Sequence, residues 1–220
     1  MQSHYCVRWC QTGWRDFPHD HWRQTVDFDG NYGQFCRADV ETETAWFPVQ
    51  TPHTANTSSE PVPTICFPMH PFLGIMDVTT ASNQRPSSIP PADYGGNIDL
   101  RNLTVESTLF LPVQIEGAGL YIGDSHFAQD DGEVSLTALE ASLRATLRAQ
   151  VVPTAEDKRL FGRTDLPFAI SHGTLIPMGF SSTLDDALSQ SVEHAINMIT
   201  AMFEMPRQDF LFRMKSLKSS

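Results

Sequence analysis

Apolar side chains recur at helical spacing near the end of the chain, at Leu184, Leu188, Val192, Ile196, Ile199 and Phe203. Steps of three and four residues place these side chains on one face of an α-helix. Ser182 or Thr183 can cap the first turn, where Asp185 and Asp186 interact favourably with the helix dipole. Pro206 cannot continue a helix. The pattern therefore predicts a helix of about five turns that ends before Pro206.

The middle of the chain carries short apolar runs bounded by turn residues, a pattern typical of β-strands. These runs predict strands at residues 71–78, 108–115 and 119–123, with a turn at 116–118. Residues 136–152 fit both a helical and an alternating pattern, and we favour a strand from about residue 140 onward. The sequence thus predicts a mainly β fold, with a β-sandwich or barrel-like core and a long C-terminal α-helix.

Loops separate these predicted elements. Residues 50–64 and 82–97 are rich in proline, serine and other turn residues and have no periodicity, so we expect them to be exposed. We divide the chain into an irregular N-terminal segment with short strands (1–64), a core (65–205) and a basic C-terminal tail (206–220).

Composition narrows the class of partner. The chain has 220 residues, 40% of them hydrophobic, which is enough for a sizeable core. Its 26 acidic and 15 basic residues give a net charge of −11, which argues against nucleic acid or an anionic membrane as the main partner. A small neutral substrate fits better. The first residues lack the pattern of a signal peptide, and no apolar run reaches the ~20 residues of a membrane span, so we expect a cytoplasmic protein.

The densest polar chemistry of the chain lies in residues 123–133. Asp124 and His126 are two residues apart, so their side chains point the same way if the backbone is extended. A carboxylate and an imidazole in this arrangement suit two ligands of one divalent metal. Glu133 can return as a third ligand or act as a general base. The alternative is that Asp-Asp-Gly forms an ordinary turn and His126 is solvated.

Two other motifs allow different chemistry. Gly-Asp-Ser at 123–125 resembles the nucleophile motif of some esterases, but the Asp-x-x-His that should follow it occurs only upstream, at Asp16 and His19. His19 and His21, with two cysteines near the N-terminus, could form a zinc site, although their spacing fits no standard zinc module.

Five blocks of sequence follow one another in a recognisable order over residues 70–205. The first is His-Pro-Phe-Leu-Gly-Ile-Met at 70–76, and the second, within 89–99, contains Ile-Pro-Pro and Tyr-Gly-Gly-Asn-Ile-Asp. Leu-Thr and Ser-Thr-Leu-Phe-Leu-Pro-Val follow within 103–113, then the 123–133 segment, and then Met-Gly-Phe and Leu-Asp-Asp-Ala-Leu within 178–188. Together they resemble the acetamidase/formamidase family of amide hydrolases.

This resemblance implies a mainly β fold, hydrolysis of short linear amides such as formamide and acetamide, a zinc-like divalent metal, and homo-oligomers. The family's loop usually reads Gly-Asp-Gly-His-Ala-Ala-Gln-Gly-Asp-Gly-Glu. Here Ser125, Phe127 and Asp130 replace two glycines and an alanine, which crowds the segment and adds a charge. The polar residues that remain are Asp124, His126, Gln129, Asp131 and Glu133.

From the resemblance we expect Asp124, His126 and Asp131 to hold the metal. Glu133 is then the proton carrier, and Gln129 or Asn97 donates a hydrogen bond to the oxyanion. The chain is also shorter than members of the family, so we expect a truncated member that lacks the N-terminal region and the extreme C-terminal part. The alternative to an active amidase is therefore a non-catalytic remnant of the same fold.

Overall fold

The computed structural model describes residues 7–10, 33–48, 63–133, 138–153, 159–162 and 165–217. Most of the loop expected at 50–64 lies outside these residues. The same is true of Asp16, His19 and His21, on which the two alternative motifs depend.

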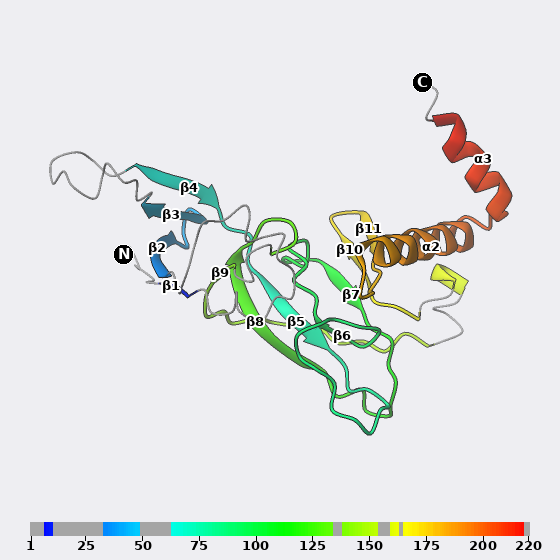
Figure 1. Ribbon diagram of the computed structural model, residues 1–220, viewed down its shortest axis with the longest axis horizontal. Helices are drawn as coiled ribbons and strands as arrows, with labels where there is room; N and C mark the ends of the chain where they lie inside the picture. Colours follow the sequence, from blue (N-terminus) through cyan, green and yellow to red (C-terminus); the bar gives the residue numbers. More distant parts are fainter. Residues whose placement is uncertain are drawn as a thin grey trace, which may run out of the picture. The chain divides into compact units, whose positions relative to one another are not determined.

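The chain folds into two compact units, whose segments alternate along the sequence. The first unit contains residues 1–73, Asp99–Arg101 and 124–143, and the second contains 74–98, 102–123 and 144–220. Both units contain antiparallel strands, and a long helix lies near the C-terminus (Figure 1). The prediction of a mainly β fold with a C-terminal helix is therefore confirmed.

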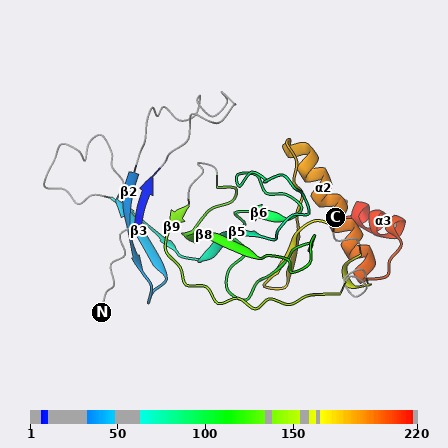
Figure 2. The ribbon, with the colours of Figure 1, turned by 90° about the horizontal axis from the view of Figure 1, so that it is seen from below.

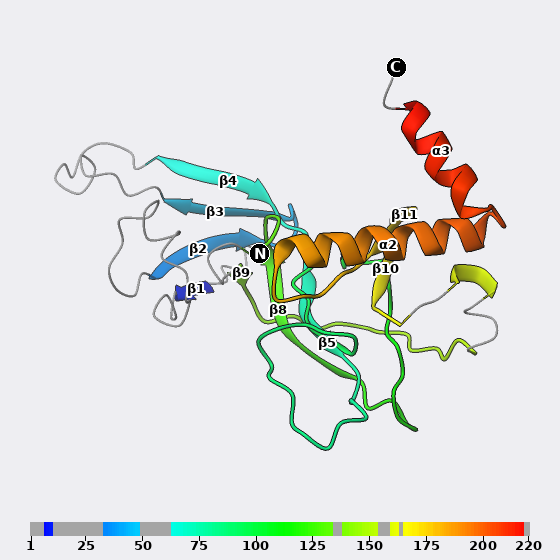
Figure 3. The ribbon, with the colours of Figure 1, turned by 45° about the vertical axis from the view of Figure 1, so that its right-hand side comes forward.

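A four-stranded antiparallel sheet forms the larger part of the first unit. Its strands are β1 (Val7–Cys10), β2 (Gly33–Asp39), β3 (Thr44–Pro48) and β4 (Thr64–Pro68), which lie side by side in chain order (Figure 3). The remaining pair in this unit joins the end of β8 (Tyr121–Ala128) to β9 (Leu139–Glu140).

The core of the first unit lies between these elements. It consists of small and apolar residues from β2, β3, β8 and β9 and the residue that follows β4, namely Cys36, Ala38, Ala45, Met69, Phe127 and Leu139. Two backbone hydrogen bonds tie the chain after β4 to its surroundings, from Met69 N to Glu43 O and from His70 N to Phe127 O. Burial of Phe127, worth roughly 2 kcal/mol, thus anchors the part of β8 that carries His126.

The second unit contains two groups of strands. Strand β5 (Phe72–Asp77), which begins in the first unit, pairs here with β6 (Gly95–Asn97) (Figure 2). A three-stranded sheet has the order β11–β10–β7, with β7 at Thr108–Phe110, β10 at Phe168–Ser171 and β11 at Thr174–Pro177. Phe110 and Phe168 stack across β7 and β10, with ring centroids 4.3 Å apart.

Helix α2 (Leu184–Met202) confirms the helix predicted from sequence. Thr183 caps it by accepting a hydrogen bond from Asp186 N, as one of the two expected caps. The helix packs against the β10–β11 hairpin, where His194, Ile196 and Met198 are buried. Gly179 lets the helix approach closely, because a side chain there would meet the backbone of Ala187 and Ser191.

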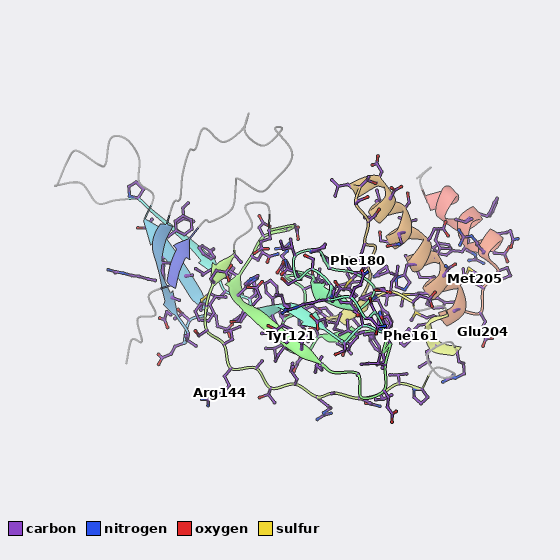
Figure 4. The ribbon with its side chains drawn as sticks, turned by 60° about the horizontal axis from the view of Figure 1, so that its bottom comes forward. Tyr121, Arg144, Phe161, Phe180, Glu204 and Met205 are labelled. Atoms are coloured by element: carbon purple, nitrogen blue, oxygen red, sulfur yellow. The ribbon has the colours of Figure 1, made fainter. Side chains whose placement is uncertain are left out.

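A second helix, α3 (Arg207–Leu217), occupies most of the tail at 206–220, where the sequence indicated no element. The corner that precedes it holds Glu204 and Met205 (Figure 4), and Met205 N donates to Thr200 O. None of the helices in the described part of the chain combines the length and the apolar character that a membrane span requires.

Three strand predictions need correction. Strand β9 ends at Glu140, and residues 141–153 form no regular structure; these residues alternate in polarity, but most are exposed and no described strand pairs with them. The strand predicted at 108–115 stops at Phe110. The strand predicted at 119–123 begins at Tyr121 and continues to Ala128, so the first half of the polar segment 123–133 is strand.

Candidate functional site

Strands β8 and β9 of the first unit bring an imidazole and three carboxylates together. His126 lies opposite Glu140 in the antiparallel pairing, and Asp124 lies two residues before His126 on β8. All three carboxylates approach the same ring nitrogen, Nε2 of His126. The distances are 3.3 Å to Asp124 Oδ1, 3.5 Å to Glu140 Oε2 and 3.9 Å to Glu133 Oε1.

His126 is completely buried, and its ring meets the edge of Phe72 with centroids 4.9 Å apart at 90°. Neither ring nitrogen has a hydrogen-bond partner within the described part of the chain. A buried polar atom without a partner costs roughly 1–3 kcal/mol. Asp124 and Glu140 remain 32% and 37% exposed, so the cluster is open on their side.

A fourth carboxylate, Asp99, faces Glu133, which in its protonated form donates a hydrogen bond to it. Burial raises the pKa of Glu133 to about 8, and the nearby charge of Asp99 adds to the effect. Burial also raises the pKa of Asp99 above its ordinary value. These two groups thus hold a proton near neutral pH, which suits proton transfer.

The nearby carboxylates also change the pKa of His126. Burial lowers the pKa of His126, but Asp124, Glu140 and Glu133 outweigh burial, so that this pKa lies above its ordinary value. The negative field at Nε2 therefore attracts a cation, which can be a proton or a metal ion.

Three of the four carboxylate residues have left-handed backbone conformations. The φ angles are 47° at Asp99, 52° at Asp124 and 43° at Glu133. Residues other than glycine adopt this region rarely, and such conformations cluster at functional sites. The surrounding structure therefore holds these side chains in place at the cost of local strain.

The donor set fits a divalent metal. Two overlapping groups of three ligands are close enough to hold an ion, Asp99/His126/Glu133 and Asp124/His126/Glu140. Imidazole nitrogen and carboxylate oxygen are ordinary ligands of zinc, and Nε2 of His126 is buried without a partner. The residues present therefore fit the expected cofactor.

The other predicted site residues, Asp131, Gln129 and Asn97, make hydrogen bonds of their own. Asp131 accepts two hydrogen bonds from Arg101, at 2.6 Å from Nε and 3.2 Å from Nη2, and its side chain is 79% exposed. Gln129 Nε2 donates to the backbone carbonyl of Asp99 at 2.6 Å. Asn97 belongs to the second unit, where its amide donates to Ile89 O at 3.2 Å.

Two members of the cluster were not predicted. Glu140 lies in residues 136–152, which fit both a helical and a strand pattern. Asp99 is the last residue of the block Tyr-Gly-Gly-Asn-Ile-Asp, and the sequence suggested no role for it. The hydroxyl of Ser125, the nucleophile of the esterase alternative, donates to the backbone carbonyl of Ala141. That bond gives Ser125 a structural role.

Comparison with known proteins gives two kinds of match. Residues 80–160 match the model of the Acetamidase/Formamidase family. A formamidase of Methylophilus methylotrophus is 48% identical over 48 residues, which are 22% of this chain and 12% of the relative. An acetamidase of Mycolicibacterium smegmatis is 46% identical over 54 residues, which are 24% and 13% of the two chains.

Solved structures resemble a larger part of the chain. An acetamidase from Yersinia enterocolitica superposes with a TM-score of 0.63 at 18% identity, over 96% of this chain and 57% of that one. One from Bacillus halodurans gives 0.61 at 16% identity, over 91% and 57%. These likenesses establish the fold, and the chain spans little more than half the length of either structure.

Proposed function

We propose that this chain, whose residues 80–160 match the Acetamidase/Formamidase family model, hydrolyses short linear amides to ammonia and a carboxylate. Formamide and acetamide are the proposed substrates. The observation that carries the proposal is the buried Nε2 of His126, which has no hydrogen-bond partner in the described part of the chain and faces three carboxylates.

Asp124, His126 and Glu140 are the proposed metal ligands, with Glu140 in place of the expected Asp131. We propose zinc as the metal. A divalent ion bound there would polarise the amide carbonyl and lower the pKa of a bound water to roughly 7. The partial exposure of Asp124 and Glu140 leaves room for substrate on that side.

Glu133 is the proposed proton carrier. Its carboxyl takes the proton of the attacking water and delivers it to the leaving amine nitrogen, so the bond to nitrogen breaks with ammonia as the leaving group. Its raised pKa, about 8, lets the same group accept and donate protons near neutral pH. Asp99 supports this role because its charge and hydrogen bond raise the pKa of Glu133 and so make its carboxylate a stronger base toward the attacking water.

Gln129 and Asn97 remain the proposed donors to the oxyanion. Each amide nitrogen has a second hydrogen besides the one donated to a backbone carbonyl. Such a donor contributes about 3 kcal/mol to transition-state stabilisation in other enzymes. A small neutral amide as substrate, a cytoplasmic location and a homo-oligomeric state complete the proposal.

Metal content and ammonia release test this function. We expect the purified protein to hold about one zinc per chain and to release ammonia from formamide or acetamide, and Asp124→Asn to lose both properties. Asp130→Asn is the matched control, since it makes the same change on a side chain that is 98% exposed. A folded, zinc-loaded protein that releases no ammonia from any short amide contradicts the proposal.

The second candidate is a non-catalytic remnant of the same fold. The coverage of the solved acetamidases, 57% of the Yersinia enterocolitica chain, is the observation that favours it. Zinc binding without ammonia release, together with activity in a longer chain that contains these residues, would support this alternative.

A further inference from the structure

The tripeptide Asp99–Arg101 belongs to the first unit although its neighbours on both sides belong to the second. Three alternate residues of one segment hold it there. Gln129 donates to the carbonyl of Asp99, Asp131 accepts from the guanidinium of Arg101, and Glu133 pairs with the carboxyl of Asp99.

The contact between Arg101 and Asp131 is the most directional of the three. Two N–H groups of one guanidinium face the two oxygens of one carboxylate, at 2.6 and 3.2 Å. A bidentate pair fixes orientation as well as distance, which a lysine in place of arginine cannot do. Asp130 is a weaker neighbour, 3.8 Å from Nη1.

The same pair has a direct geometric consequence for the proposed site. Arg101 lies two residues after Asp99, and Asp131 lies two residues before Glu133. Asp99 and Glu133 both have left-handed backbones, a conformation that persists only when surrounding contacts impose it. The ion pair, together with the Gln129–Asp99 hydrogen bond, ties these two backbones together from outside the cluster of carboxylates and imidazole.

We propose that Arg101 and Asp131 are positioning residues, whose bidentate pair holds the carboxyl of Asp99 beside Glu133. Asp131 then acts on the reaction through Arg101 and does not bind the metal. The catalytic part of this inference rests on the proposed function, whereas the positioning part concerns the structure of the metal-free chain.

Amide hydrogen exchange and kinetics of Asp131→Asn, Arg101→Gln and the double variant test the pair. We expect exchange at residues 99–101 of the metal-free protein to become roughly fivefold faster in each single variant, the upper end for an exposed ion pair. Amide exchange in the double variant should be no faster than in either single variant, because each single change already removes the interaction. Zinc content and KM should stay unchanged, and kcat should fall by a similar factor.

Asp130→Asn is the matched control, since it removes the same charge one residue away and keeps an oxygen that can accept from Asp131 N. Arg101→Lys should keep only part of the wild-type protection against amide exchange at residues 99–101. If Asp131→Asn and Asp130→Asn give the same exchange at 99–101, the positioning role is wrong. If Asp131→Asn loses zinc while Arg101→Gln keeps it, Asp131 is a ligand and the inference is also wrong.

Failure of the proposed function gives a different result. A wild-type chain that binds no zinc and releases no ammonia rejects the amidase. The exchange comparison at 99–101 then still decides whether the pair holds Asp99 beside Glu133.

Discussion

Glu140 lies opposite His126 in the β8–β9 pairing, with Oε2 3.5 Å from Nε2 of the ring. The pairing therefore adds a carboxylate that the spacing within residues 123–133 could not supply. His126 therefore has two alternative groups of partners for a metal, one with Asp124 and Glu140 and one with Asp99 and Glu133.

Metal retention separates these two positions. We expect Glu140→Gln and Asp124→Asn to lose zinc, because a charged ligand becomes a weaker neutral one. Glu133→Gln should keep zinc and lose about 100- to 10,000-fold in kcat, the usual contribution of a general acid-base group. Elemental analysis after dialysis gives the metal content before any kinetic measurement.

The opposite pattern assigns the metal to the other group. If Glu133→Gln loses zinc and Glu140→Gln retains it, Asp99, His126 and Glu133 are the ligands. The control is Asp130→Asn, whose side chain lies outside both groups.

The stability of the metal-free protein should fall as the pH rises. The pKa of Glu133 is raised from 4.5 to about 8 in the folded chain, so the folded state binds more protons than the unfolded state between these values. The stabilisation is complete below the unfolded pKa and is lost as the pH passes through the folded one. The raised pKa of His126 acts in the same direction.

Thermal unfolding of chelator-treated protein measures this effect. We expect Tm to drop between about pH 5 and about pH 8, and Glu133→Gln to remove part of the drop. Zinc should bind more tightly across the same range, because its ligands must be deprotonated. A Tm of the metal-free protein that rises over this range contradicts the assignment.

Local patterns in the sequence could indicate those features whose residues lie close together along the chain. Asp124, His126 and Glu133 could be recognised because they lie close together in sequence, and α2 because its apolar residues are periodic. The role of Asp99 and Glu140 depends on which strands and loops meet, which no local spacing encodes. The bond between Asp131 and Arg101 likewise joins two distant segments, so local spacing could not indicate it.

The same limit applies to the apolar stripe of α2. The periodicity predicts a helix, but it does not show which residues of the apolar stripe are buried in the fold. Ile196 is buried, whereas Leu184 and Leu188 are 90% and 63% exposed. The buried positions also include His194, which the stripe does not contain.

His194 should make the second unit sensitive to acid. Burial lowers the pKa of this histidine, more than the hydrogen bond to Met178 O and the charge of Asp165 raise it. The folded state therefore binds fewer protons than the unfolded one, and stability is lost as the pH falls below about 6.5 toward the folded pKa. This sign is opposite to that expected for Glu133.

Unfolding of wild type and His194→Gln near pH 7 and near pH 5 tests this difference. We expect the variant to be less stable than wild type near neutrality, because the packing against Phe168 is lost, and the difference between the two proteins to be smaller near pH 5. Equal acid sensitivity in the two proteins would show that another group is responsible.

Gly179→Ala should weaken the attachment of α2 in the second unit. The added methyl group meets backbone atoms of Ala187 and Ser191, which cannot rotate away as a flexible side chain could. Overpacking of this kind costs typically 1–3 kcal/mol, so we expect a lower free energy of unfolding in denaturant titrations. Ser189→Ala, on an exposed position of the same helix, should change it by less than about 0.5 kcal/mol. Equal stability of the two variants would mean that α2 does not need its close approach at Gly179.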